Sequence, residues 1–149
     1  MARRYAVSGP SESGTGPKTA VAIIGSTAVR PIVYDIMAGS PTTPADQTWQ
    51  FVAARFTASG TGASAPTPEL LDSGDVAAVC TTKITHSAEP TYAAVFLLDF
   101  PLHQKATFRW VASPGGEIIG SAAADDGIGV KNHLASAALV ARVTAHWAE

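Results

Sequence analysis

Glycine and proline interrupt this chain too often for it to form long helices. Its 149 residues include 13 glycines and 10 prolines, which disfavour the interior of a helix. A parallel sheet needs helical crossovers between its strands, and no segment of this sequence shows a helical pattern suited to that role. We therefore expect an all-β fold of about eight strands, either an antiparallel β-sandwich or a jelly-roll-like barrel.

Six apolar, β-branched runs predict strands. They are residues 19–24, 29–37, 49–57, 76–84, 92–100 and 106–112. Pro31 cannot donate to a ladder, which predicts a strand start or a sheet edge for the second run, and we expect an edge. The fifth run is almost continuously apolar, so we expect burial on both faces and an end at Pro101. The sixth alternates, which places Phe108 and Trp110 in the core, while residues 59–75 are predicted to form a long surface loop.

The segment 134–147 fits two patterns. Leu139, Val143 and Trp147 have the spacing of a helix face. However, every second residue from Ala135 to Trp147 is apolar, and the opposite positions include Ser136, Arg142, Thr144 and His146. A long strand with one buried face accounts for both observations, so we favour the strand and keep the helix as the alternative.

The N-terminal segment is rich in residues that disrupt regular structure. Five of the ten residues from Ser8 to Pro17 are glycine or proline, which leaves little backbone suited to a ladder. We therefore expect residues 1–18 to form an extended N-terminal arm and residues 19–149 to form a single β domain. Arginine and tyrosine are common interface anchors, so Arg3, Arg4 and Tyr5 are the candidate interaction residues. The alternative is a terminus that stays disordered.

Composition argues against several classes of partner. The formal net charge is −2 and the cationic residues are scattered, so we expect no nucleic-acid partner. No apolar run has the 18 or so residues of a transmembrane helix, and the first residues lack the apolar region of a secretory signal. We therefore expect a soluble protein with no membrane partner. A single cysteine, Cys80, excludes an internal disulfide and is expected to be a small core residue.

No motif predicts an enzyme. His86, His103, His133 and His146 lack the spacing of a zinc site, and no serine lies in a Gly-x-Ser-x-Gly elbow. Residues 125–127, Asp-Asp-Gly, predict a turn in preference to a calcium loop. We expect no catalytic residue, no metal and no cofactor.

The three tryptophans, Trp49, Trp110 and Trp147, each lie in a predicted strand beside other large apolar residues. We therefore expect them to pack in the core. A surface on which sugars stack is the alternative, and it requires an exposed ring.

Several short motifs follow one another along nearly the whole chain. They are RRYAVSGPSESG at 3–14, RPIVYD at 30–35 with the loop GSPTTPAD at 39–46, EPTY at 89–92, RWVASPGGE at 109–117 and DGIG at 126–129, before an apolar strand that ends at Glu149. In this layout the chain resembles small virion structural proteins of tailed bacteriophages. These motifs are features of layout, and none is a catalytic signature.

The resemblance implies a non-enzymatic capsid decoration (cement) protein that binds and stabilises the shell of the major capsid protein. It implies a place on the capsid surface of the virion after synthesis in the host cytoplasm. Its expected partners are the major capsid protein or other virion subunits, together with further copies of itself in a dimer or trimer. A tail or head-tail connector component is the first alternative, and a carbohydrate-binding module is the second.

Overall fold

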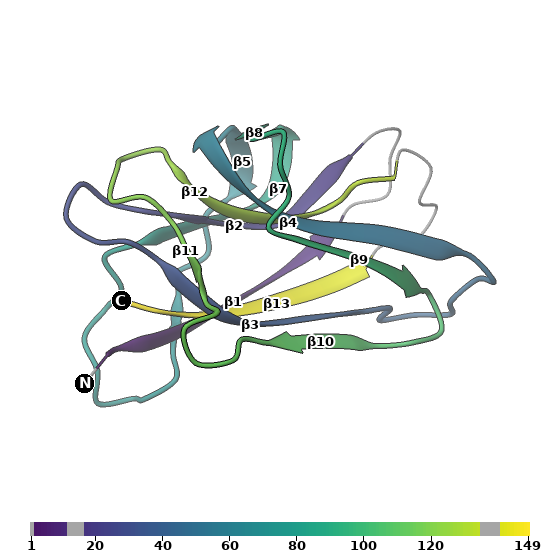
Figure 1. The fold of residues 1–149 in the computed structure, drawn as a ribbon, viewed down its shortest axis with the longest axis horizontal. Coiled ribbons are helices and arrows are strands. Elements are labelled where there is room, and N and C mark those ends of the chain that lie inside the picture. Colours follow the sequence, from purple (N-terminus) through teal and green to yellow (C-terminus); the bar gives the residue numbers. More distant parts are fainter. Residues whose placement is uncertain (1, 12–16, 135–140) are drawn as a thin grey trace.

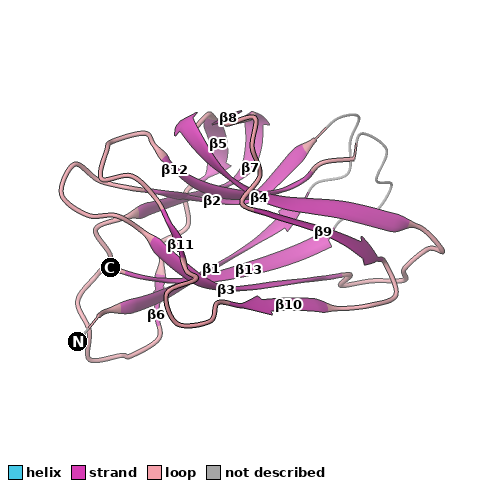
Figure 2. Ribbon diagram, viewed as in Figure 1, coloured by secondary structure: helices cyan, strands magenta, loops and turns pink. Residues whose placement is uncertain are grey.

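The structure is a computed structural model that describes residues 2–11, 17–134 and 141–149. Every helix or strand in these ranges is a β-strand (Figure 2). The strands are β1 (Arg4–Ser11), β2 (Lys18–Ile24), β3 (Ile32–Gly39), β4 (Thr48–Ala58), β5 (Thr61–Ser64), β6 (Glu69–Leu70), β7 (Thr81–Ala88), β8 (Thr91–Tyr92), β9 (Leu98–His103), β10 (Phe108–Val111), β11 (Ile118–Ile119), β12 (Gly127–Asn132) and β13 (Ala141–Ala148). The predicted all-β class is confirmed.

Two antiparallel sheets pack against each other and enclose the core (Figure 1). Sheet A has the order β10-β3-β13-β1-β6, and β11 also pairs with β3. Sheet B has the order β5-β7-β2-β12-β4-β8, and β9 also pairs with β4. In the view of Figure 1, sheet A forms the lower layer and sheet B the upper layer. The predicted sandwich is confirmed, whereas the two sheets do not close into a barrel.

The C-terminal segment is a strand from Ala141 onward, as its period-two pattern predicts. Four alternate residues of β13 have no exposed surface: Ala141, Val143, Ala145 and Trp147. The helix alternative is therefore wrong for this part of the segment. Residues 135–140, which include Leu139, lie outside the described residues.

The prediction of an N-terminal arm is wrong for residues 4–11. These residues form β1, which pairs along its full length with β13, from Arg4 opposite Ala148 to Ser11 opposite Ala141. Because β1 lies between β13 and β6, it is an interior strand of sheet A over Tyr5 and Ala6. The domain therefore includes much of the segment assigned to the arm.

Glycine within β1 has a packing role that the sequence pattern did not reveal. A Cβ at Gly9 would lie 2.1 Å from the carbonyl oxygen of Ala20 in β2. Only glycine allows the two backbones to approach so closely where β1 crosses the other sheet. At this position glycine permits close packing and does not end the strand.

Two predictions based on proline are also corrected. The strand near Pro31 is not at an edge, because β3 begins one residue later and lies between β13 and the pair β10 and β11. Pro101 does not end its strand but lies within β9, opposite Gln50 of β4. Because β9 pairs only with β4 in the described part of the chain, it is an edge strand, and an edge strand can accommodate the missing backbone N–H of proline.

Three other segments differ from expectation. The predicted loop 59–75 contains β5 and β6, and the strand expected at 76–84 begins only at Thr81, as β7. The run 92–100 contains a break between β8 and β9, where Val95 is 75% exposed. Apolar character alone therefore did not predict burial in this part of the chain.

Some of the large aromatic residues lie in the core, and others lie at the edge of sheet A. Trp49 and Trp147 are fully buried, as predicted, and Cys80 is 1% exposed. Phe108 and Trp110 are only half-buried, and both pack against the core from β10 at the edge of sheet A. The prediction that both are core residues thus holds only in part.

The turn before β12 is held by a carboxylate, as its sequence predicts. Asp125 has a φ of 71° and accepts hydrogen bonds from the amide and the hydroxyl of Ser59. The ammonium of Lys83 in turn donates to the Ser59 hydroxyl over 2.7 Å. These contacts tie the turn to the end of β4.

This turn predicts a specific effect of acid. Hydrogen bonds from Ser59 lower the pKa of Asp125 in the folded chain. The resulting stabilisation is full above the ordinary aspartate pKa of about 3.9 and is lost as the pH falls through the lowered value. We expect Asp125→Asn to reduce the dependence of the unfolding free energy on pH below about pH 4, measured by urea denaturation. Ser59→Ala should have a smaller effect in the same direction, because the backbone amide of residue 59 still donates to Asp125. An unchanged dependence in both variants would contradict this explanation.

Candidate functional site

The two sheets differ in how far the chain covers their outer faces. Part of the outer face of sheet B is covered. Tyr92 of β8 lies across the outer face of sheet B, where its hydroxyl would be 2.2 Å from a Cβ at Gly129 of β12. The same hydroxyl is 2.8 Å from the Thr19 hydroxyl on β2. Tyr92 also packs against a small cluster of buried residues, Ala22, Ile24 and Phe56. This part of the face is therefore covered by the protein's own side chains.

Polar contacts fix the segment that covers sheet B. The Glu89 carboxylate accepts hydrogen bonds from the amide and the hydroxyl of Thr19, at 2.9 and 2.5 Å. The ammonium of Lys131 lies 4.2 Å from the centre of the Tyr92 ring, which is a favourable cation–π contact. Burial lowers the pKa of Lys131 and raises the pKa of Tyr92. These groups hold the covering segment in place.

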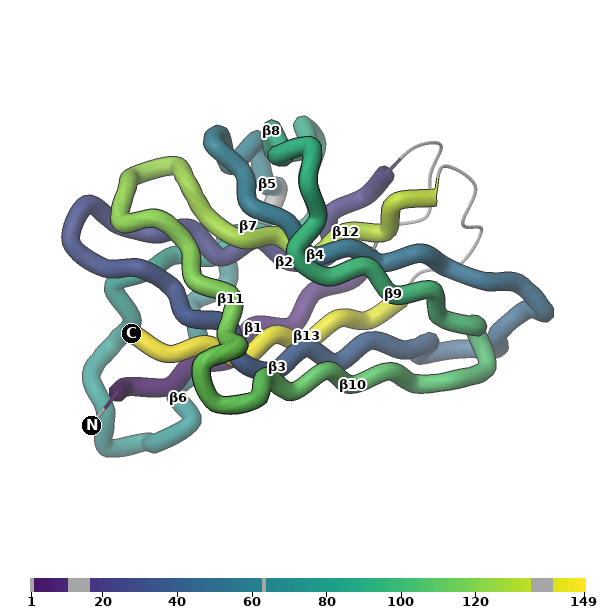
Figure 3. Tube along the Cα trace, in the orientation of Figure 1, coloured from purple at the N-terminus to yellow at the C-terminus, as the bar shows by residue number. Residues whose placement is uncertain are grey.

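The outer face of sheet A has no comparable cover among the described residues. Its side chains are those that alternate with the buried residues of β1, β13, β3 and β10. We call the part of this surface away from the chain termini the open face; it consists of Ala6, Ser8, Pro10, Asp35, Met37, Gly39, Arg109, Val111, Arg142, Thr144 and His146. Five of these residues are small: Ala6, Ser8, Pro10, Gly39 and Thr144. In Figure 3 the trace of β1, β13 and β3 runs along the lower side of the molecule, and the only strands labelled below them, β10 and β6, belong to the same sheet.

A charged cluster marks the centre of the open face. The Asp35 carboxylate receives two hydrogen bonds from the guanidinium of Arg109, from Nε at 3.1 Å and from Nη2 at 2.7 Å. Nδ1 of His146 is 3.4 Å from the same carboxylate. Asp35 is only 3% exposed, so these partners compensate for the loss of its hydration. The carboxylate raises the pKa of Arg109, which therefore remains a cation.

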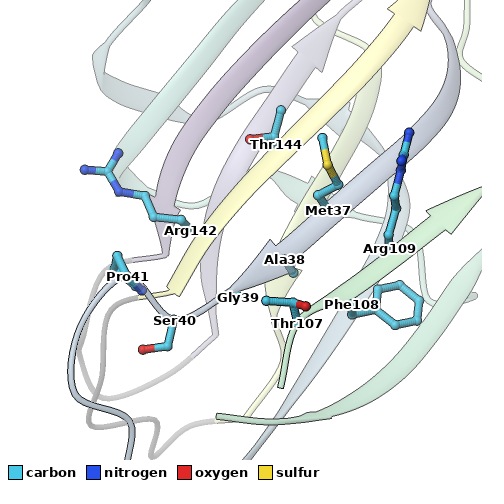
Figure 4. A pocket seen from close by; sticks show the side chains of 10 residues that line it. All are labelled: Met37, Ala38, Gly39, Ser40, Pro41, Thr107, Phe108, Arg109, Arg142 and Thr144. Carbon is cyan, nitrogen blue, oxygen red and sulfur yellow. The ribbon is translucent and has the colours of Figure 1, made fainter. Parts of the chain in front are cut away.

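A shallow depression of about 390 Å³ lies at one end of the open face. Gly39, Phe108 and Thr144 contribute to its lining. Arg109 and Arg142 flank it, and Figure 4 shows that their guanidinium groups point away from each other. Because the two guanidinium groups do not converge, they cannot both bind one small anion. Their separation is suited to contact with an extended protein surface.

The three predicted interaction residues have different environments. Arg3 and Arg4 are exposed, as an interface role requires. Tyr5 is fully buried, its ring centre is 5.7 Å from that of Trp147, and its hydroxyl donates to the Val76 carbonyl. The expectation that Tyr5 is an exposed anchor is therefore wrong. It is a core residue because β1 is a strand of the sheet.

Arg109, Arg142 and Thr144 were not among the interaction residues predicted from the sequence. The sequence did predict the outward orientation of two of them, because Arg142 and Thr144 occupy the polar positions of the alternating pattern in β13. What the pattern cannot show is that no other part of the described chain covers that side.

The described residues show no cluster that would support catalysis at a metal. No group of three or more histidine, cysteine or acidic side chains comes together within these ranges. His103 pairs with Asp46 over 2.9 Å, whereas His146 pairs with Asp35 on another sheet. The same ranges contain no helix capable of crossing a membrane.

The fold and the open face define a class of protein: an antiparallel β-sandwich with one uncovered sheet face. Comparison of the chain with protein-family models, with curated protein sequences and with solved structures gives no match.

Proposed function

We propose that this chain is a non-enzymatic structural protein of a bacteriophage virion that binds the capsid shell through the open face of sheet A. One observation carries the proposal: the chain covers the outer face of sheet B with Tyr92 but leaves the outer face of sheet A uncovered among the described residues. An uncovered sheet face that carries small residues together with two arginines is suited to broad contact with another protein. The resemblance to small virion proteins supports the same reading.

The charge of the open face indicates the chemistry of the partner. Arg142 is exposed and makes no ion pair with a described residue, and Arg109 remains 60% exposed although it pairs with Asp35. The whole chain, by contrast, has a formal net charge of −2. We therefore expect the facing surface of the major capsid protein to be acidic, since complementary charge favours association and fixes orientation.

Binding of the purified chain to particles that lack it tests this proposal. We expect Arg142→Glu to weaken binding about tenfold or more, which corresponds to about 1.4 kcal/mol, and Thr144→Arg to weaken it by placing a large side chain in the contact. Arg30→Glu is the matched control, because Arg30 is exposed outside the open face and its reversal changes the net charge equally. Equal binding by all three variants and the wild-type chain would refute the proposal.

Two alternative outcomes are recognisable in the same experiment. Binding confined to tails or to isolated connectors would assign the protein to that part of the virion. Binding to glycans that is lost in Trp110→Ala would assign it to the carbohydrate-binding class, because Trp110 is the tryptophan that is only half-buried.

A further inference from the structure

A second surface lies at the end of sheet A where the chain termini meet, on the same side of the sheet as the open face but beyond the residues that define it. A groove of about 590 Å³ crosses this end. Ile32, Tyr34, Ile119 and Ala148 contribute to its largely apolar lining, and Arg4 also lines it. We call it the terminal groove. It is larger than the depression beside Arg142.

An apolar projection is present near the same end. The loop of residues 71–80, between β6 and β7, exposes Leu71 by 45%, Val76 by 54% and Val79 by 45%. Three large apolar side chains exposed on one short loop make this loop a candidate interaction site. We call this segment the apolar loop, and Figure 1 shows it in teal beside the N-terminus.

The apolar loop is held firmly against its own domain. The Leu71 amide donates to the Arg4 carbonyl, and the Tyr5 hydroxyl donates to the Val76 carbonyl, both over 3.0 Å. The carboxylate of Glu149 accepts from the amides of Val79 and Cys80, at 2.9 and 2.7 Å. A loop fixed in this way beside β1 cannot fold over to fill the terminal groove of its own chain. It is preorganised to contact another molecule.

We propose that the apolar loop of one copy of this chain occupies the terminal groove of a second copy. One molecule carries both an exposed apolar loop and an apolar groove, and the described residues of the same chain neither cover the loop nor fill the groove. One charge in the groove is also complementary to the loop. The loop carries Asp72 and Asp75 and no cation, while Arg4 lines the groove and makes no ion pair with a described residue. Glu117 also lines the groove, so the attraction for the acidic loop comes from Arg4 and is opposed in part by Glu117.

Such a contact joins two different surfaces, so it builds a reciprocal dimer, a closed ring or, where the rotation does not close, an open filament. The terminal groove and the open face lie on the same side of sheet A, where the ring centre of Tyr34 is 6.2 Å from that of His146. Variants at Val76 and Ile119 test self-association, whereas variants at Arg142 and Thr144 test capsid binding, so the failure of one proposal is distinguishable from the failure of the other.

The test is the association state of the full chain, measured by sedimentation and native mass spectrometry. We expect the wild-type chain to self-associate. Val76→Lys places a charge on the apolar loop, and Ile119→Lys places a charge in the terminal groove. Each variant alone should therefore be monomeric at concentrations where the wild-type chain is assembled. Val95→Lys is the matched control, because Val95 is exposed on a different loop, and it should associate like the wild-type chain.

Mixing the two damaged variants gives the sharpest result. The intact loop of the Ile119→Lys chain can enter the intact groove of the Val76→Lys chain, so an equimolar mixture should form heterodimers although each variant alone is monomeric. Heterodimer formation also demonstrates that both variants are folded. A monomeric wild-type chain, normal association of either variant, or folded variants that form no heterodimer would each overturn the proposal.

Discussion

A chain from which residues 2–11 are deleted is expected not to fold. The deletion removes β1, which pairs with β13 through eight residue pairs and contributes Tyr5 and Val7 to the core. It also exposes the edge of β13 and leaves a gap beside Trp147. Losses of this kind exceed the marginal stability of about 5 to 15 kcal/mol of a typical domain. Far-ultraviolet circular dichroism should show no cooperative thermal transition.

Cys80 provides an independent measure of that unfolding. Burial is the main cause that raises the pKa of the native Cys80 thiol to about 12, so the folded chain should resist alkylation at neutral pH. The deleted chain should react at once. Deletion of Ala2 and Arg3 alone is the control, because both residues precede β1, and it should leave Cys80 protected. A deletion of residues 2–11 that unfolds cooperatively and protects Cys80 would show that β1 is dispensable.

The second large effect is expected at Trp147. Its side chain has no exposed surface and packs against Tyr5 between the two sheets. We expect Trp147→Ala to lower the free energy of unfolding by about 3 to 5 kcal/mol, the usual cost of deleting a buried large aromatic side chain. Urea denaturation measures this change.

Trp110 is the natural comparison for Trp147. It lies in β10 at the edge of sheet A and is only half-buried, so Trp110→Ala should cost about half as much, since the hydrophobic contribution scales with the apolar area buried. Equal costs at the two positions would contradict the assigned burial.

The sequence predicted the fold class because its strongest signals are local. The alternation in β13 predicts a strand with a defined inner face, the β-branched run in β2 predicts a strand that is apolar on both faces, and both strands were found. The strand β1 was missed because glycine and proline were taken as signs of irregular structure. Gly9 is required by the close approach of Ala20, and Pro10 lies beyond the residues at which β6 pairs with β1. Both reasons depend on neighbours distant in sequence.

The open face was only partly predictable for a related reason. Alternation placed Arg142 and Thr144 on the polar side of β13, but it did not show whether another segment covers that side. The cover of sheet B depends on Tyr92 reaching across Gly129 to Thr19, a contact between residues far apart in the chain. The absence of such a cover over sheet A among the described residues becomes visible only in three dimensions.

The most direct test of the central claim is an electron cryomicroscopy reconstruction of an intact virion that contains this chain. The proposed function predicts the sandwich on the outer capsid surface, with Arg142 and Thr144 of sheet A toward the major capsid protein. Tyr92, on the outer face of sheet B, would then face away from the shell. A reconstruction in which the sandwich lies in the tail, or sits on the capsid with the open face of sheet A directed to solvent, would contradict the proposed function.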